Sequence, residues 1–396
     1  MNLPVITLLL CQIVLCAGMH RVRLSKHSRR HHKFPHISVY LANRNRIRGK
    51  HGLTPIHAIN GGIEPTSNTG SDSKGVVVAR LVNSCETNFF GTIKMGGNNP
   101  QTFTVQYDTG SSDLWLPSSK CGSCKKCGSS LFKESKSDTL HQNKTGFSIT
   151  YGSGSVKGLV ANDVLTIGDL RVENQGFGLV NDTTDCSVFD GILGMAFPRL
   201  SQIGTLPPFQ RMLAQELLEN QIFSFYMKSG SSDGGLLIIG GSNSSLYYGP
   251  LTYTKVTEEK YWSFQMGSIG FHGTDVRSCE SGCPAIMDTG TSLIVGPVTE
   301  VHGLMQAIAA VYDATLDLWT IDCKLIETLP HLVIQIEGTM FYVHPATYVI
   351  RYSDFCFVGI MDMRGLTKWI IGDVFLRENY VEFDLKNKRM GIAPAV

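Results

Sequence analysis

From residue 76 to the C-terminus, apolar residues occur in short runs that turn-forming residues separate. The clearest runs are FFGTIKM, TFTVQYD, GFSITYG, LLIIGG, LVIQIEG, WIIGDVF and YVEFDL, with Gly, Asn, Asp or Ser between them. Such runs, rich in β-branched and aromatic residues, predict β-strands. Only residues 207–220, which begin with proline, and residues 298–311 predict helices. The pattern therefore predicts an all-β protein with minor helices.

The composition agrees with this prediction. Of the 396 residues, 42% are hydrophobic, 17% are charged and 41 are glycine. This length allows two domains, and the hydrophobic content allows a large core. Glycine adopts the positive φ that tight turns between strands require.

The first 18 residues predict a cleaved signal peptide. Residues 3–17 are almost wholly apolar, and the small residues Cys16, Ala17 and Gly18 offer a cleavage site. The stretch is shorter than the roughly 20 apolar residues that span a bilayer. A retained anchor is the alternative, because no positive charge precedes the apolar stretch. We expect no membrane anchor elsewhere in the chain.

Residues 19–75 predict a basic arm followed by a linker. Residues 19–78 contain eleven Lys and Arg against two acidic residues, a net charge of +9, whereas the remainder carries −7. The arm also contains seven of the twelve histidines. A basic arm can bind nucleic acid, a membrane or the acidic body of its own chain. Export disfavours nucleic acid as a partner, and a solvated, disordered leader is the plainest alternative.

Cysteine usage indicates an oxidising compartment. Nine cysteines follow the signal peptide, which allows four disulfides and one free thiol. The Cys121-x-x-Cys124-x-x-Cys127 spacing could instead belong to a metal knuckle, but no second half lies nearby. We therefore expect no metal and no cofactor. Three glycosylation sequons, at Asn143, Asn181 and Asn243, fit the same secretory route.

One phrase occurs twice in the chain. QYDTGSSDLW, residues 106–115, and AIMDTGTSLI, residues 285–294, both contain Asp-Thr-Gly, and their aspartates are 180 positions apart. An apolar-Gly phrase follows each, FDGILG with Asp190 and IIGDVF with Gly372. This order predicts a duplicated lobe, with the two Asp-Thr-Gly loops meeting at a pseudo-twofold axis.

Two carboxyl groups held close together have a defined chemistry. They cannot both ionise easily, so they share a proton. The ionised member can take a proton from a water while the protonated member polarises a carbonyl. Such a pair can hydrolyse an amide without a covalent intermediate. The glycine of each loop allows close approach without a Cβ clash.

With these motifs the chain resembles the pepsin-like aspartic endopeptidases, the family of pepsin, cathepsin D and renin. The resemblance runs from about residue 76 to 396 and rests on FTVQYDTGSSDLWLPS, ITYGSGSVKG, FDGILGMAF, AIMDTGTS and IIGDVFL. It implies a bilobal pepsin-like fold, with an N-terminal lobe at 76–250, a C-terminal lobe at 251–396 and a cleft between them. It also implies peptide-bond hydrolysis in acid, with a preference for bulky hydrophobic residues at the cut.

The resemblance further implies the roles of individual residues. Asp108 and Asp288 would be the catalytic pair, and the residues that support them would be Thr109, Gly110, Ser111, Thr289, Gly290 and Thr291. Tyr151 would lie on a flap over the cleft and hydrogen-bond to Trp115. Gly152, Ser153 and Ser292 would contact the substrate backbone. Phe189 and Ile294 would contribute to the apolar cleft.

Four disulfides are expected from the same resemblance. Cys279–Cys283 and Cys323–Cys356 match the family's usual pairs. Of the three cysteines after Trp115, we expect Cys121 to pair with Cys127. An additional Cys85–Cys186 bridge would leave Cys124 free.

The basic arm resembles the pro-segment of these enzymes. It would block the cleft at neutral pH as an intramolecular inhibitor, and acid would release it by protonating carboxylates on the body. The mature chain would begin near Val76. Protein or peptide substrates, a monomer, and a place in the secretory pathway, extracellular or digestive lumen or lysosome are expected.

Two other kinds of function remain open. A catalytically silent homologue would bind peptides in its cleft, although both Asp-Thr-Gly loops and Tyr151 are intact. A secreted interaction protein would use the basic arm to bind acidic glycans, and an arm that is retained would favour it.

Overall fold

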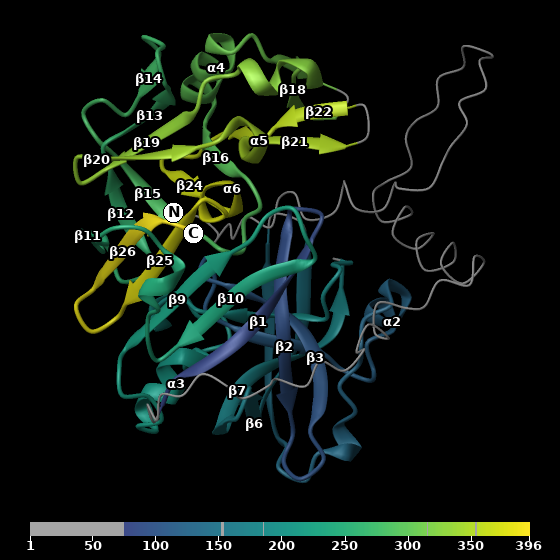
Figure 1. The fold of residues 1–396 in the computed structure, drawn as a ribbon. Helices are drawn as coiled ribbons and strands as arrows, with labels where there is room; N and C mark the ends of the chain where they lie inside the picture. The colour runs from purple at the N-terminus through teal and green to yellow at the C-terminus, as the bar shows by residue number, and fades with distance from the viewer. Residues whose placement is uncertain (1–74, 152–153, 185, 315, 353–354) are drawn as a thin grey trace, which may run out of the picture.

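The computed structural model describes residues 75–151, 154–184, 186–314, 316–352 and 355–396. The predicted signal peptide, almost all of the basic arm, and Gly152 and Ser153 therefore lie outside the described residues. Figure 1 shows two β-rich halves, with the C-terminal half above the N-terminal half. No helix in the described ranges is long and apolar enough to cross a membrane.

The largest sheet in the described residues has the strand order β11-β26-β25-β9-β10-β1-β2-β3-β8-β4-β7-β6-β5. Its strands are β1 (Val77–Ser84), β2 (Asn88–Met95), β3 (Gln101–Asp108), β4 (Leu114–Pro117), β5 (His141–Thr150), β6 (Ser155–Ile167), β7 (Leu170–Thr183), β8 (Gly191–Gly194), β9 (Ile222–Met227), β10 (Asp233–Ile239), β11 (Thr252–Lys255), β25 (Asn379–Asp384) and β26 (Arg389–Pro394).

Three smaller sheets form the C-terminal half. The first has the order β12-β15-β24-β16-β23, the second β14-β13-β19-β20 and the third β17-β18-β22-β21. Their strands are β12 (Ser263–Met266), β13 (Ser268–Phe271), β14 (Arg277–Ser278), β15 (Cys283–Met287), β16 (Ile294–Pro297), β17 (Val311–Asp313), β18 (Leu318–Thr320), β19 (Leu332–Ile336), β20 (Thr339–Val343), β21 (Val349–Tyr352), β22 (Phe355–Val358), β23 (Ile360–Met363) and β24 (Trp369–Ile371).

The last two strands of the chain join the sheet of the first half. β25 pairs antiparallel with β9, from Val381 opposite Phe225 to Asp384 opposite Ile222. β26 pairs in turn with β11. The two halves therefore share one continuous sheet, and the division into lobes at residue 250 stays a prediction.

Helices in the described residues are few and short, as the apolar pattern predicts. They are α2 (Gly122–Cys127), α3 (Pro208–Ala214), α4 (Val298–Ala307), α5 (Pro345–Tyr348) and α6 (Asp373–Leu376), and the 3₁₀ turns are η3 (Glu134–Lys136), η4 (Pro198–Leu200), η5 (Ser244–Leu246) and η6 (Cys323–Thr328). Both predicted helices end earlier than expected. Glu216 and Ala309, two residues past α3 and α4, have φ of 55° and 53°, and this left-handed conformation ends each helix.

The run WIIGDVF forms β24 and then α6 rather than one strand. The change occurs at Gly372, where an added Cβ would lie 2.0 Å from the carbonyl oxygen of Thr291. The backbone N–H of Asp373 donates to that same carbonyl at 2.8 Å. The second Asp-Thr-Gly loop therefore rests on the turn between β24 and α6.

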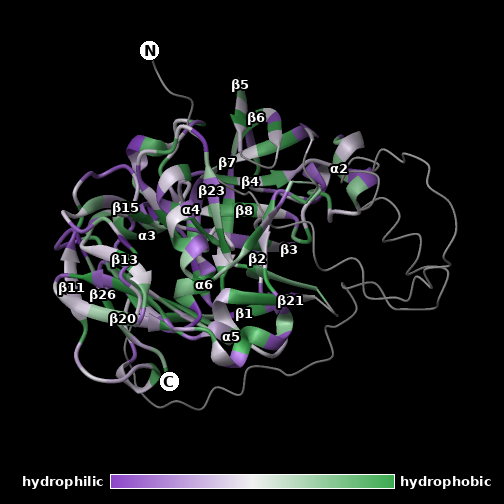
Figure 2. Ribbon diagram, turned by 90° about the horizontal axis from the view of Figure 1, so that it is seen from above, coloured by the Kyte–Doolittle hydropathy of each residue, from purple (hydrophilic) through white to green (hydrophobic). Residues whose placement is uncertain are grey.

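One hydrophobic core runs through both halves. Phe223, Phe383 and Trp262 pack together near its centre, with ring centroids 4.8 to 5.6 Å apart. The indole N–H of Trp262 donates to the carbonyl of Met195 at 3.0 Å, which ties the start of the second half to the first. Figure 2 shows apolar residues concentrated in the central strands, including β8, whose four residues are all buried.

Two expected disulfides are wrong. Cys121 pairs with Cys124, so Cys124 is not free, and Cys127 pairs with Cys186. The reason is local: Cys121 is the N-cap of α2, which brings Cys124 to a Cα distance of 5.3 Å, within the usual range for a disulfide. Cys127, at the end of α2, then reaches the segment that follows β7. This pairing leaves no thiolate among the three clustered cysteines for a metal knuckle.

The structure also forms the Cys279–Cys283 and Cys323–Cys356 disulfides, each with a Cα distance of 5.3 Å. Asn143, Asn181 and Asn243, the three sequon residues, all lie exposed at the surface.

Candidate active site

The two repeated loops begin at the ends of equivalent strands. Asp108 is the last residue of β3, and Asp288 directly follows β15. β3 runs parallel to β8 with Asp108 beside Gly194, and β15 runs parallel to β24 with Met287 beside Ile371. Each apolar-Gly phrase therefore lies next to the strand that carries its aspartate.

The threonines of the two loops bind each other's backbone. The N–H of Thr109 donates to the hydroxyl of Thr289 at 2.9 Å, and the N–H of Thr289 donates to the hydroxyl of Thr109 at 2.9 Å. The two hydroxyls donate to the carbonyls of Met287 and Tyr107, at 2.9 and 2.7 Å. Both threonines are fully buried. This reciprocal set fixes the two loops at one separation.

The glycine of each loop lies against the carboxyl group of the other loop. A Cβ at Gly110 would lie 2.4 Å from Asp288 Oδ1, and a Cβ at Gly290 would lie 2.2 Å from Asp108 Oδ1. Real side chains do not tolerate such distances. Glycine is therefore required at both positions because each opposing carboxyl group occupies the space that a methyl group would need.

Each carboxyl group accepts hydrogen bonds from its own loop. The N–H of Gly110 donates to Asp108 Oδ1 and that of Gly290 to Asp288 Oδ1, both at 2.8 Å. The hydroxyl of Ser111 donates to Asp108 Oδ2, and that of Thr291 donates to Asp288 Oδ2 at 2.8 Å. The two loops thus have matching hydrogen-bond sets, with serine in one where threonine stands in the other.

Burial raises the pKa of both carboxyl groups of the pair. Burial raises the pKa of Asp108, although the Ser111 hydroxyl, the Gly110 N–H and Asp288 favour its ionised form. The pKa of Asp288 is raised well above its ordinary range, by burial first and by the charge of Asp108 second. The pair therefore shares one proton, and the pKa is raised more strongly at Asp288 than at Asp108.

Tyr151 and Trp115 pack against each other in the first half, in an apolar cluster separate from the main core. The indole N–H of Trp115 donates to the hydroxyl of Tyr151 at 2.7 Å. Phe189 belongs to the same apolar cluster, and its ring lies 6.4 Å from that of Phe90. The N–H of Tyr151 donates to the carbonyl of Gly154, which closes the turn after β5.

Two predicted substrate-binding residues have other contacts. Ile294 is fully buried in the main core on β16, where it pairs with Ile371 and Ile360. The buried hydroxyl of Ser292 donates to the carbonyl of Thr87. Ile294 therefore serves packing, and the Ser292 side chain ties the second loop to the first half.

Two further residues, to which the sequence patterns assigned no role, are linked electrostatically to the pair: Asp373, inside the IIGDVF phrase, and Tyr261. Asp373 opens α6, and neither of its buried carboxyl oxygens has a hydrogen-bond partner among the described residues. Burial raises the pKa of Asp373 well above its ordinary range. Burial, followed by the charges of Asp288 and Asp108, raises the pKa of Tyr261 to about 12. The Tyr261 side chain packs against the apolar cluster that contains Ile286 and Ile370, on the paired strands β15 and β24.

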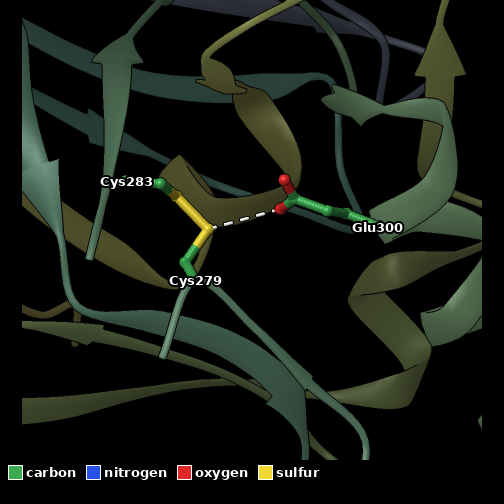
Figure 3. A group of neighbouring side chains, drawn as sticks. All are labelled: Cys279, Cys283 and Glu300. Carbon is green, nitrogen blue, oxygen red and sulfur yellow. Dashed lines mark hydrogen bonds between the residues drawn. A yellow bond between two sulfur atoms is a disulfide. The ribbon is translucent and has the colours of Figure 1, made fainter. Parts of the chain in front are cut away.

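A group of Cys279, Cys283 and Glu300 lies elsewhere in the second half (Figure 3). Cys279 Sγ lies 3.4 Å from Glu300 Oε2, an oxygen that also accepts a hydrogen bond from the Trp369 indole at 2.8 Å. Both sulfurs are joined in the disulfide, so neither is a thiolate ligand. The group is a structural contact between α4, β24 and the disulfide loop.

Two homologous loops that bury their carboxyl groups against each other, in two connected β-rich halves, define an aspartic endopeptidase of the bilobal kind. The comparison with known families agrees. The chain belongs to the eukaryotic aspartyl protease family, whose model matches residues 88–395. The all-β, pepsin-like fold expected from the sequence is thereby confirmed.

Individual relatives match over most of the chain. Gastricsin of Suncus murinus is 38% identical over 321 residues, which cover 78% of this chain and 82% of gastricsin. Pepsin A of Sus scrofa is 37% identical over 79% of this chain and 83% of its own length. Chymosin of Callithrix jacchus is 37% identical over 82% of this chain and 86% of its own length.

Proposed function

We propose that this chain is an acid-activated endopeptidase in which Asp108 and Asp288 act together on one water molecule. The observation that carries the proposal is the mutual contact of the two loops, in which each glycine faces the opposite carboxyl group. Their different proton affinities give the two carboxyl groups different roles. Asp108 is the base and Asp288 is the acid.

The reaction follows from these roles. Asp108 takes a proton from a water held between the two carboxyl groups, and the water oxygen bonds to the peptide carbonyl carbon. Asp288 gives its proton to the carbonyl oxygen, so the product of this step is a neutral gem-diol. Breaking the C–N bond then requires a proton on the nitrogen, which Asp108 supplies. Asp288, ionised in the first step, takes a hydroxyl proton of the gem-diol as the carboxylic acid forms, and the pair returns to its starting state.

The side chains around the pair support specific tasks. Ser111 and Thr291 hold the outer carboxyl oxygens, and Thr109 and Thr289 fix the spacing of the loops. Tyr151, anchored by Trp115, shares an apolar cluster with Phe189, and this cluster favours a bulky apolar side chain at the cut. The flap residues Gly152 and Ser153, outside the described residues, would contact the peptide backbone.

The charge distribution supports acid activation. An arm of net charge +9 precedes a body of net charge −7, so the two attract at neutral pH. Acid removes negative charge from the body and adds positive charge to the seven arm histidines. We propose that the arm then leaves the cleft and is cut near Val76. Passage through the secretory pathway to an acidic lumen or lysosome follows from the same reasoning.

The test uses the full chain, expressed through a secretory route and shifted from pH 7 to pH 4. Its mass and its cleavage of denatured haemoglobin are followed with and without pepstatin. We expect loss of the arm and pepstatin-sensitive cleavage. Asp108→Asn and Asp288→Asn should each abolish cleavage, whereas the control Asp169→Asn, in the exposed turn between β6 and β7, should retain it.

A full chain that cuts no haemoglobin could be an enzyme that has not been activated, or a homologue that only binds peptides. Trimming the arm near Val76 separates the two possibilities. If the trimmed chain, correctly folded by circular dichroism, still cuts no protein, the proposed activity is wrong.

A further inference from the structure

Two lysines lie beside one aromatic ring near the candidate catalytic pair. Lys260 Nζ is 5.8 Å from the centre of the Tyr261 ring, and Lys368 Nζ is 5.6 Å from the same centre. Lys260 precedes Tyr261 in sequence, whereas Lys368 reaches the ring from the residue before β24. Both lysines and the tyrosine are half-buried. Two positive charges therefore converge where water screens them less than on an open surface.

The Tyr261 ring packs on the strands that lead to Asp288. Tyr261 packs against an apolar cluster that contains Ile286 and Ile370. Ile286 is two residues before Asp288, and Ile370 lies beside it on the parallel strand β24. The lysine ammonium groups therefore lie on the C-terminal side of the site, next to the strand that carries Asp288.

The backbone holds this arrangement in place. The carbonyl of Lys260 accepts a hydrogen bond from the N–H of Phe197 at 3.3 Å, and Trp262 donates to Met195. Trp369, which follows Lys368, is fixed by its hydrogen bond to Glu300. Both lysines thus extend from anchored segments, which lowers the entropy lost when a ligand orders them.

The neighbouring acidic residues have other partners. Glu258 pairs with Arg199 at 3.6 Å, and Glu259 pairs with Lys388 at 2.6 Å. Asp362, on β23 of the same sheet, accepts a hydrogen bond from the Trp319 indole at 2.9 Å. Within the described part of the chain, neither Lys260 nor Lys368 forms an ion pair. Their positive charge is therefore available to a ligand.

We propose that Lys260 and Lys368 make this peptidase select substrates that carry an aspartate or glutamate near the cut. This inference rests on the proposed function and names the substrate class of that same site. The chain's own arm is strongly basic, so it does not supply the acidic group. An extended peptide advances about 3.3 Å per residue, so peptides that carry the acidic group at each position within three residues of the cut locate the contact.

The experiment compares matched peptides on the arm-free enzyme. One peptide series has apolar residues at the cut and glutamine elsewhere; each member then carries glutamate at one position within three residues of the cut. The measured quantity is the ratio of kcat/KM for each glutamate peptide to that of its glutamine partner at pH 5. Two half-buried charges predict a ratio of about three to ten at the favoured position.

The ratio should respond to charge on both molecules. At pH 3 the glutamate, with an ordinary pKa of about 4.3, becomes neutral and the ratio should fall toward one. Lys260→Met with Lys368→Met should bring the ratio at pH 5 toward one, because the apolar stems remain and the charges do not. Lys368→Glu should reverse the preference. The effect should lie mainly in KM, since the contact forms equally in bound substrate and transition state.

Lys324→Glu, an exposed lysine on η6, is the matched control and should leave the ratio unchanged. Efficient cleavage of the glutamine peptides with a ratio of one at every position overturns this inference and leaves the proposed function standing. A ratio that survives in the double methionine variant also overturns it. Failure to cut any peptide overturns the proposed function and this inference with it.

Discussion

The reciprocal threonine bonds give the sharpest prediction about stability. Replacing Thr109 with valine keeps the side-chain shape and removes one hydroxyl. That hydroxyl donates to the Met287 carbonyl and accepts from the Thr289 N–H, each at 2.9 Å. Both threonines are fully buried, so water has no access to replace the lost partner.

The magnitude follows from the two groups left without a partner. An unsatisfied buried polar group costs about 1–3 kcal/mol, so Thr109→Val should lower the free energy of unfolding by about 2–6 kcal/mol. The loops also hold the candidate catalytic pair, and a misplacement of about 1 Å can reduce catalysis on the order of a hundredfold. Stability and kcat/KM should therefore fall together.

Urea unfolding followed by tryptophan fluorescence measures the first effect, and peptide cleavage measures the second. Thr109→Ser keeps the hydroxyl and should retain most of the stability. Thr102→Val, on the exposed face of β3, is the matched control and should change stability by less than about 0.5 kcal/mol. A loss from Thr109→Val no larger than that of the control would refute the reasoning, because it would show that the bonds contribute nothing beyond shape.

Three further predictions follow from contacts around the site. Gly290→Ala places a methyl group 2.2 Å from Asp108 Oδ1, so peptide cleavage should drop by at least a hundredfold, whereas Gly122→Ala, where an added Cβ meets open space, should leave cleavage intact. Tyr151→Phe removes the acceptor for the Trp115 indole and should cost about 1–3 kcal/mol in urea unfolding; an unchanged midpoint would contradict the value assigned to that bond. Burial raises the pKa of Asp373, so the unfolded chain releases its proton first as pH rises and wild-type stability should decline above the ordinary pKa of 3.8. Asp373→Asn should remove this decline, and parallel stability curves for the two proteins between pH 3 and pH 7 would count against it.

Local sequence determined the chemistry of this protein. Asp-Thr-Gly occurs twice, and each copy contains the carboxyl group, the hydroxyl groups and the glycine that the site requires. Short apolar runs bounded by turn residues predicted the strands. This prediction needs only neighbouring positions, because successive side chains of a strand point to opposite faces of its sheet. These features are readable because each is complete within about ten residues.

Tertiary structure decided which distant groups meet. Cys186 pairs with Cys127 rather than Cys85 because α2 orients Cys127 toward the segment after β7, and no spacing in the sequence records that orientation. Ile294 is buried because strands from later in the chain, with Ile360 and Ile371, pair on both sides of it. Lys260 and Lys368 are 108 positions apart and share a ring only because β24 returns beside the strand of Asp288. Sequence periodicity describes the faces of single elements, whereas pairing between elements depends on the geometry of the whole chain.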